Sequence, residues 1–521
     1  MDRNLGLTLL LVLLLCHKGN SESLCPYKCQ CFTPVQVFCA DERLMALPSN
    51  MSTQVEDFIL MISSVSYLFT HTFKESPQLT KLVFLNNTLI SIHAMAFESL
   101  TELQELEISG NPSLENLFLE TFSKQRKLIK LFLNHNGLKT VPPGTFDSLT
   151  QLQTLQMKGN IISYLPTFLF LHLHKLRVLD LSQNKLTGVT RETFSGLSGL
   201  EILKLNNNFI SNLTSDMFHN MSQLTELHME WNKIAQLSDD VFSMLPSLKV
   251  LNLRGNLLTT FSEKVFGFQP SNLSELNLKG NRLTQLSSLS SLTSLADIDL
   301  SSNRLSMLPE DIFLNITFLE TIDVSENQLT SLPERIFNDL FIIKSLYLHR
   351  NNLTKLDTQL FRDQSFLQQL YLSENQLETL PPGLLDPFIF QPTLRLHGNP
   401  WKCDCQIRYL HDWVLSSSRD IEMLDRVLCG SPGYLRNHAV ASIDENQLVC
   451  QMSKDEHVQD LSTCRLQASN DTFIIKCKVD KCSPHTVKVQ FQEEDGSIKE
   501  HIVKNEVDHS QCTSNKTTTI Q

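Results

Sequence analysis

The side chains that could do chemistry in this sequence belong to thirteen cysteines, sixteen histidines and several groups of acidic residues. His172 and His174 are separated by one residue, a spacing that could hold a metal ion, but the pair is isolated. The sequence contains no H-E-x-x-H, G-x-S-x-G or phosphate-binding glycine loop, the motifs that place catalytic or nucleotide-binding groups. We therefore predict that the protein is not an enzyme and has no catalytic residue, cofactor or metal site of its own.

Acidic residues gather at outward positions of two neighbouring repeated segments: Asp297, Asp299, Asp323 and Glu326. Aromatic and arginine side chains are enriched in interface hot spots, and acidic clusters attract basic partners. The patch is either a solvated surface or a contact site. The candidate partner-binding residues are Asp299, Asp323, Tyr347, His349, Arg350 and Tyr371. A second candidate patch contains Trp231, His228 and Glu230.

A repeated segment must position these residues. Residues 176–186 have the pattern L-x-x-L-x-L-x-x-N-x-L, the leucine-rich repeat signature. A frame that begins at Val55, with Ser63 in the asparagine slot, adds one earlier repeat. The asparagine returns in steps of 24 residues, with two steps of 25 and one of 22, at Asn87, Asn111, Asn136, Asn160, Asn184, Asn208, Asn232, Asn256, Asn281, Asn303, Asn327, Asn351, Asn375 and Asn399. The period predicts an α/β repeat fold, a horseshoe-shaped leucine-rich repeat solenoid with caps at both ends.

Each repeat combines a short strand with an outer segment. The L-x-L pattern directs alternate leucines into the solenoid, and Asn184 should bond backbone groups of its own turn and of the next repeat. An aromatic residue usually follows ten residues after the asparagine and should form a buried column: Phe73, Phe97, Phe122, Phe146, Phe170, Phe194, Phe218, Phe242, Phe266, Phe313, Phe337 and Phe361. The short repeat after Asn281 has Ser291 at this position, and we expect a local change in curvature there.

The N-terminal residues 1–21 read as a secretory signal peptide, with an apolar run too short to span a bilayer. Its removal takes Cys16 away and leaves twelve cysteines, an even number that suits disulfides in an exported chain. No apolar stretch near the C-terminus is long enough for a membrane helix or lipid anchor. We therefore expect a secreted, extracellular protein.

The cysteines divide the chain further. Residues 25–49 should form an N-terminal cap, 55–398 the array, 399–450 a C-terminal cap and 451–521 a small disulfide-held β module. Zinc binding by the first group is the less favoured alternative. In the C-terminal cap, residues 409–413 suggest a helix, and Trp401 and Trp413 should belong to its core. The three groups are Cys25, Cys29, Cys31 and Cys39; Cys403, Cys405, Cys429 and Cys450; and Cys464, Cys477, Cys482 and Cys512, the last with three possible connectivities.

Glycosylation signals are frequent. The N-x-S/T sequons lie at Asn50, Asn86, Asn212, Asn220, Asn272, Asn315, Asn352, Asn470 and Asn515, and we expect about two-thirds of them to carry glycans. The net charge of -12 gives no sign of nucleic-acid binding.

Four local motifs are distinctive: V-F-C-A-D-E at 37–42, L-T-K-L-V-F-L-N at 79–86, L-H-G-N-P-W-K-C-D-C at 396–405 and E-N-Q-L-V-C at 445–450. These motifs resemble those of the leucine-rich, non-catalytic subunits of carboxypeptidase N. The tail spacing C-x12-C-x4-C-x29-C is similar as well. The resemblance extends over essentially the whole mature chain, although the tail residues between the cysteines diverge.

This resemblance implies disulfides between Cys403 and Cys429 and between Cys405 and Cys450. It also implies a glycosylated plasma subunit that binds a catalytic zinc carboxypeptidase subunit in a heterotetramer, stabilises it and retains it in circulation. Such an enzyme removes C-terminal Arg or Lys from kinins and anaphylatoxins. The alternative is a soluble leucine-rich repeat binding protein, either a pattern-recognition decoy or a serum inhibitor. Neither function involves nucleic acid or a membrane anchor.

Overall fold

The computed structural model describes residues 25–48, 51–268 and 271–450, together with the backbone of five strands between 464 and 520. The expected signal peptide, Asn50, Asn470, Asn515, Cys482 and Cys512 lie outside the described residues. The described chain forms two compact units. The first extends to residue 348 and includes 359–367 and 387–390; the second contains 349–358, 368–386 and the residues from 391 on. The domain boundaries drawn from the sequence stay predictions.

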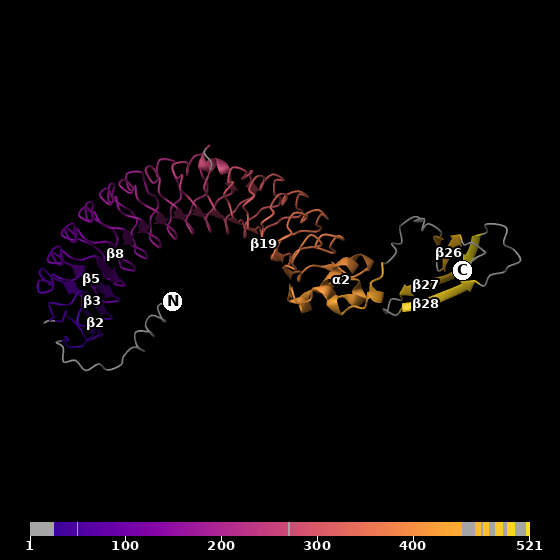
Figure 1. The fold of residues 1–521 in the computed structure, drawn as a ribbon, viewed down its shortest axis with the longest axis horizontal. Coiled ribbons are helices and arrows are strands. Elements are labelled where there is room, and N and C mark those ends of the chain that lie inside the picture. Colours follow the sequence, from indigo (N-terminus) through magenta and orange to yellow (C-terminus); the bar gives the residue numbers. More distant parts are fainter. Residues whose placement is uncertain are drawn as a thin grey trace. The chain divides into compact units, whose positions relative to one another are not determined.

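The first unit is built on one sheet of parallel strands, one strand for each repeat. In Figure 1 its labelled strands follow one another along the inner side of a curved ribbon, which we call the concave face of this unit. In order, the paired strands are β2 (Gln36–Ala40), β3 (Asp57–Met61), β5 (Lys81–Leu85), β7 (Glu105–Ser109), β8 (Lys130–Phe132), β9 (Thr154–Gln156), β10 (Val178–Asp180), β11 (Ile202–Lys204), β12 (Glu226–His228), β13 (Val250–Asn252), β15 (Glu275–Asn277), β17 (Asp297–Asp299), β18 (Thr321–Asp323) and β19 (Ser345–Tyr347).

The leucines of the repeat explain both the strand and its register. On β10 and just after it, Leu179 is fully buried and Leu181 is 1% exposed. Val178, the residue before Leu179, is only partly buried. Leu179 pairs with Leu155 on one side and Leu203 on the other, so identical slots lie in line. A shift by one residue would turn the buried leucines outward, and the burial therefore fixes the register.

A ladder of buried asparagines holds each repeat to its neighbour. The Asn184 Nδ2 donates to the Leu181 carbonyl oxygen of its own turn (3.1 Å) and to that of Met157 in the preceding repeat (2.9 Å). Its Oδ1 accepts from the backbone N–H of Ile162, also in the preceding repeat (3.1 Å). The expectation that Asn184 bonds the next repeat was wrong: the ladder points backwards along the chain. The same ladder includes the first repeat, where Ser63 replaces the asparagine and its Oγ donates to Asn87 Oδ1 in the following repeat.

The predicted phenylalanine column is confirmed as core. Phe97 and Phe122 stack with ring centroids 6.4 Å apart, and Phe146 and Phe170 with centroids 6.3 Å apart. At Ser291 the column lacks its aromatic ring; there Leu289 and Leu292 are fully buried, and the Ser291 hydroxyl donates to Glu263 (2.9 Å). The change in curvature expected at this repeat stays a prediction.

Each unit contains two of the described disulfides. At the N-terminal end, β1 (Cys29–Thr33) pairs antiparallel with β2, and disulfides join Cys25 to Cys31 and Cys29 to Cys39. The second unit contains α2 (Arg408–Ser416) and disulfides from Cys403 to Cys429 and from Cys405 to Cys450, the pairs that the resemblance implies. Trp401 is fully buried, as expected, whereas Trp413 is only partly buried, although its neighbour Val414 on α2 is fully buried.

The second unit has its own parallel strands β20 (Gln369–Tyr371), β21 (Thr393–Arg395) and β23 (Ile421–Glu422). Its tail strands form two antiparallel groups: β25 (Cys464–Ser469), β26 (Thr472–Lys478) and β29 (Thr517–Ile520), and β27 (His485–Gln492) with β28 (Ile498–Asn505). The remaining elements are short: β4 (Tyr67–Leu68), β6 (Ser91–Ile92), β14 (Thr260–Phe261), β16 (Gln285–Leu286), β22 (Trp401–Lys402), β24 (Cys429–Ser431), η1 (Glu263–Phe266), η2 (Cys405–Ile407), η3 (Leu424–Arg426), η4 (Gly433–Leu435), η5 (Val440–Ser442) and η6 (Glu445–Gln447). Within the described ranges, no helix has the length and apolarity needed to cross a membrane.

Candidate docking face

Three of the predicted partner-binding residues lie in a row on the concave face of the first unit. Strands β17, β18 and β19 are neighbours, and their register aligns Asp299 with Asp323 and Asp323 with Tyr347. Each side chain stands at an alternate, outward position and is partly exposed, because the flanking Ile298, Ile322 and Leu346 point into the core. The row presents two carboxylates next to one phenol ring.

The two carboxylates are held in fixed positions by the following turn. Asp299 Oδ1 accepts from the backbone N–H of Ser301 (2.9 Å) and from its hydroxyl (2.6 Å). Asp323 Oδ1 accepts from the backbone N–H of Ser325 (2.9 Å). Burial raises the pKa of Asp323, and the charge of Asp299 raises it further; the Ser325 hydrogen bonds and the charge of Lys279 oppose this rise. A cation placed over Asp323 would favour its charged form and so lower its pKa.

The other three predicted partner-binding residues lie in the second unit, and each contacts a neighbour there. The His349 and Tyr371 rings meet edge to face with centroids 6.1 Å apart. Arg350 Nε donates to Glu374 at 3.0 Å. These contacts fix the orientation of the side chains, which remain near the surface.

Tyr371 also takes part in a network that sequence reasoning missed. The Arg395 guanidinium lies 3.9 Å from the centroid of the Tyr371 ring, and its Nε donates to Glu422 at 2.6 Å. The Tyr371 hydroxyl donates to the same carboxylate at 3.4 Å. Glu422 belongs to β23, which no repeat pattern predicts, so the sequence carried no signal for this network. The network ties β20 and β21 to the strand of the cap.

The second candidate patch lies on the concave face around β12. The imidazole of His228 approaches Glu226 (3.2 Å) and Glu230 (3.4 Å), and the hydrogen bond to Glu230 is the largest of the effects that raise the His228 pKa. Trp231 is 52% exposed. The Arg254 guanidinium lies 5.5 Å from the Trp231 ring centroid, a cation–π contact that sequence reasoning also missed.

A glycine one repeat later makes room for Trp231. Trp231 has a left-handed backbone (φ 57°), and a Cβ on Gly255 would lie only 2.5 Å from its ring. His135 and Gly159 form the same pair, with 2.3 Å between the imidazole and a Cβ on the glycine. The sequence did carry a signal for this pairing. In both cases a bulky residue directly precedes one ladder asparagine, and a glycine directly precedes the next ladder asparagine.

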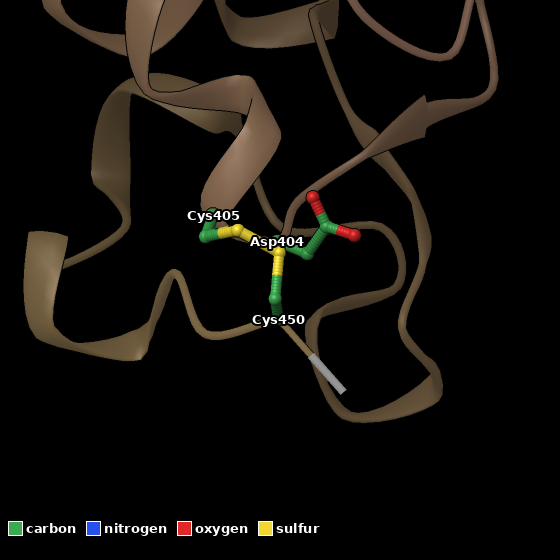
Figure 2. A group of neighbouring side chains, drawn as sticks. All are labelled: Asp404, Cys405 and Cys450. Atoms are coloured by element: carbon green, nitrogen blue, oxygen red, sulfur yellow. A yellow bond between two sulfur atoms is a disulfide. The ribbon is translucent and has the colours of Figure 1, made fainter. Parts of the chain in front are cut away.

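One grouping of metal-ligating side chains occurs among the described residues, and it does not fit a metal. Asp404, Cys405 and Cys450 lie within 4.8 Å of one another, but the two sulfur atoms are bonded to each other (Figure 2). A disulfide offers no thiolate ligand. Asp404 instead accepts from the backbone N–H of Gln406 (2.9 Å) and pairs with Lys402 (3.0 Å). His172 and His174 are both exposed, and the His174 Nδ1 lies 3.2 Å from the carbonyl oxygen of Gly196.

The sequons within the described part of the chain all have exposed asparagines: Asn86, Asn212, Asn220, Asn272, Asn315 and Asn352. Asn86 is close to the concave face, since it directly follows β5. Exposure is necessary for modification but does not show it, and glycosylation stays a prediction.

The strand ladder, the asparagine ladder and the stapled caps define the class of protein: this is a leucine-rich repeat solenoid. Family models agree over part of the chain. A model described as "Leucine rich repeat" matches residues 174–234, 232–283 and 342–388, and one described as "BspA type Leucine rich repeat region (6 copies)" matches 66–187. A leucine-rich repeat protein of Leptospira interrogans superposes with a TM-score of 0.63 and 27% identity, covering 73% of this chain and 93% of that protein.

Among characterised relatives, the chain is similar to carboxypeptidase N subunit 2. The human protein is 42% identical over 62 residues, which are 12% of this chain and 11% of that protein. The mouse protein is 34% identical over 147 residues, 24% of this chain and 26% of that protein. The matched stretches thus span far less than two-thirds of either relative. The chain is a leucine-rich repeat protein related to this subunit, and its relation is shown over those stretches.

Proposed function

We propose that this protein is a secreted, glycosylated binding subunit that holds a zinc carboxypeptidase acting on C-terminal Arg or Lys of kinins and anaphylatoxins. The single observation that carries the proposal is the similarity to carboxypeptidase N subunit 2 in human and mouse. The cap motifs and the tail cysteine spacing support it independently of the leucine pattern, which many unrelated repeat proteins share.

The binding surface that we propose is the row formed by Asp299, Asp323 and Tyr347. Its acidic side chains favour a partner with a basic surface patch, because complementary charge speeds encounter and fixes orientation. Tyr347 adds an aromatic anchor of the kind that dominates interface energetics. His349, Arg350 and Tyr371 in the second unit are proposed to contact the same partner.

The physical role of such a subunit follows from mass action. A chain that binds only the folded enzyme stabilises it by about 2.7 kcal/mol when the free subunit stands at 100 times its Kd. The zinc ion, the catalytic groups and the specificity pocket would belong to the partner. This chain would contribute a rigid face, and the glycans would add bulk that slows loss from blood.

Capture from plasma of the same species tests the proposal. The secreted chain would serve as bait, and the retained proteins would be identified by mass spectrometry and assayed for release of C-terminal Arg and Lys. Recovery of a zinc carboxypeptidase with this activity is expected. Capture of other proteins without any carboxypeptidase would contradict the proposal and favour a soluble leucine-rich repeat binder instead.

Charge reversal then tests the docking face. The double variant Asp299→Lys/Asp323→Lys should weaken the complex by roughly 2–5 kcal/mol, since charged pairs at an interface lose their partners and gain repulsion. The matched control is Asp216→Lys/Asp311→Lys, which makes the same change of charge at exposed residues outside the strands. Equal affinities of the two variants for the purified carboxypeptidase would exclude this face.

A further inference from the structure

A hollow of about 790 Å³ lies on the first unit, away from the strands of the concave face. The outer segments of neighbouring repeats form its lining, which includes Leu171, His174, Gly196, Asn220 and Met244. Leu171 is 38% exposed and Met244 is 49% exposed, so the walls combine apolar side chains with the polar edge of an imidazole. Nothing in the concave docking proposal uses this region.

Glycine keeps part of the hollow open. Gly196, Asn220 and Met244 occupy the same slot, twelve residues after the ladder asparagine, in three consecutive repeats. Gly196 has a φ of +96°, and a Cβ there would lie 2.3 Å from the carbonyl oxygen of Leu171. The backbone of Leu171 therefore excludes a side chain at Gly196, so this slot is empty of side-chain atoms in the repeat before Asn220.

Asn220 is presented for modification at the margin of this hollow. It has a left-handed backbone (φ 69°), is exposed, and begins the sequon Asn220-Met-Ser222. No hydrogen bond involves its side-chain amide within the described part of the chain. The sequon residue Asn272 differs, since its Nδ2 donates to the carbonyl oxygen of Pro246, another lining residue, at 2.9 Å.

We propose that Asn220 carries an N-glycan whose first N-acetylglucosamine occupies this hollow. In the transfer, Asn220 Nδ2 loses a proton and bonds to the anomeric carbon of the sugar. The bond from that carbon to a polyprenyl diphosphate carrier breaks, and the diphosphate leaves with the electron pair. The apolar face of the sugar lies against Met244 in the following repeat, and its hydroxyl and acetamido groups meet the neighbouring His219.

The inference rests on the secretion included in the proposed function, because the sugar donor is met on the secretory route. Beyond the proposed function, the first sugar of the Asn220 glycan packs against the protein surface, whereas a glycan elsewhere extends freely into solvent. Asn315 provides the internal control: it fills the same slot after Asn303, is exposed, has a φ of 66° and does not line the hollow.

The test uses the full chain secreted from mammalian cells, with occupancy at each sequon measured by mass spectrometry. Under native conditions peptide N-glycosidase should release the Asn220 glycan roughly tenfold more slowly than the Asn315 glycan, because release requires local opening of the packed sugar. After denaturation the two rates should agree. Equal rates under native conditions would overturn the proposal.

A second readout compares the wild type with Ser222→Ala, which removes the sequon but keeps Asn220. Hydrogen peroxide should oxidise Met244 faster in the variant, while Met307, 71% exposed and outside the hollow, reacts equally in both. Equal oxidation of Met244 in both proteins sinks the inference, and so does an empty Asn220 beside a filled Asn315. If every sequon of the protein from its own source is empty, the secretion in the proposed function fails too.

Discussion

The interior of the first unit and its concave face have the same backbone but follow different rules. The buried leucines, asparagines and phenylalanines repeat with little change from β3 to β19. The outward slots on the same strands vary in residue type: the slot that holds Lys204 on β11 holds His228 on β12, Asn252 on β13 and Asp299 on β17. The interior must stack on copies of itself, whereas each outward residue meets solvent or a partner.

We therefore expect the interior residues to determine the stability of the fold and the residues of the concave face to determine partner binding. A change in the interior breaks contacts on both sides of a repeat, and its cost should be felt wherever it falls along the array. A change on the concave face should leave the fold unaltered and act on binding. Variants that violate either half of this statement would show where the two regions are coupled.

The largest effect is expected from Phe170→Ala, which opens a cavity in the aromatic column beside Phe146. Truncating a buried phenylalanine costs roughly 3–5 kcal/mol. The matched control is Phe168→Ala, two residues earlier, because Phe168 is 50% exposed. Urea denaturation followed by circular dichroism measures both variants. A similar loss in the two would mean that the column does not carry the interior stability.

The next effect concerns the asparagine ladder. Asn208 Nδ2 donates to the Leu181 and Leu205 carbonyl oxygens, both at 3.0 Å, and its Oδ1 accepts from Leu186. Asn208→Ala leaves these buried groups without partners, at a cost of roughly 1–3 kcal/mol. Asn206→Ala, at a partly exposed position in the same turn, should lie within about 0.5 kcal/mol of the wild type. Equal midpoints in urea would contradict the ladder's role.

A third variant tests the boundary between the interior and the face. Gly255→Ala forces a side chain into a left-handed backbone and against the Trp231 ring, with an expected cost of about 1–2 kcal/mol. Gly188→Ala has open space around the new Cβ and serves as the control. Tryptophan fluorescence should shift in Gly255→Ala alone, since Trp231 is 52% exposed and contacts Gly255, whereas Trp401 and Trp413 belong to the second unit. An unchanged spectrum would mean that the glycine does not position the ring.

The smallest effect is a pH dependence at His228. Its folded pKa is raised chiefly by the Glu230 hydrogen bond and also by Glu226, against burial and the charge of Lys204. The resulting stability is fully present below the unfolded pKa of about 6.5 and is lost as the pH rises through the folded pKa. Stability should therefore exceed that of His228→Gln most clearly at low pH, with the two curves converging in alkaline solution. A difference independent of pH would exclude this protonation as its cause.

Much of the fold could be predicted because repetition amplifies a weak local signal. One L-x-x-L-x-L motif means little, but fourteen asparagines in step identify the strand, the turn and the buried column together. The sequence could not predict whether Asn184 bonds the preceding or the following repeat, because the spacing to the equivalent residues is the same in both directions. Trp413 was likewise placed in the cap core by residue type, although it is only partly buried on α2.

The candidate site was only partly predictable. Asp299, Asp323 and Tyr347 share one slot of the repeat, so their alignment follows from the sequence once the period is known. The contact of Arg395 with Tyr371 and Glu422 joins residues up to 51 positions apart through a strand outside the repeat, and no spacing rule reaches it.

The sequence by itself determined the solenoid, its period, its caps and the slots that face outward, because burial of one leucine pattern admits one register. The tertiary structure alone decided which outward side chains are bonded, in which direction their surroundings shift the pKa values of Asp323 and His228, and where the surface is hollow beside Asn220. Those properties depend on distances between repeats, which arise when the strands stack and which no single repeat contains.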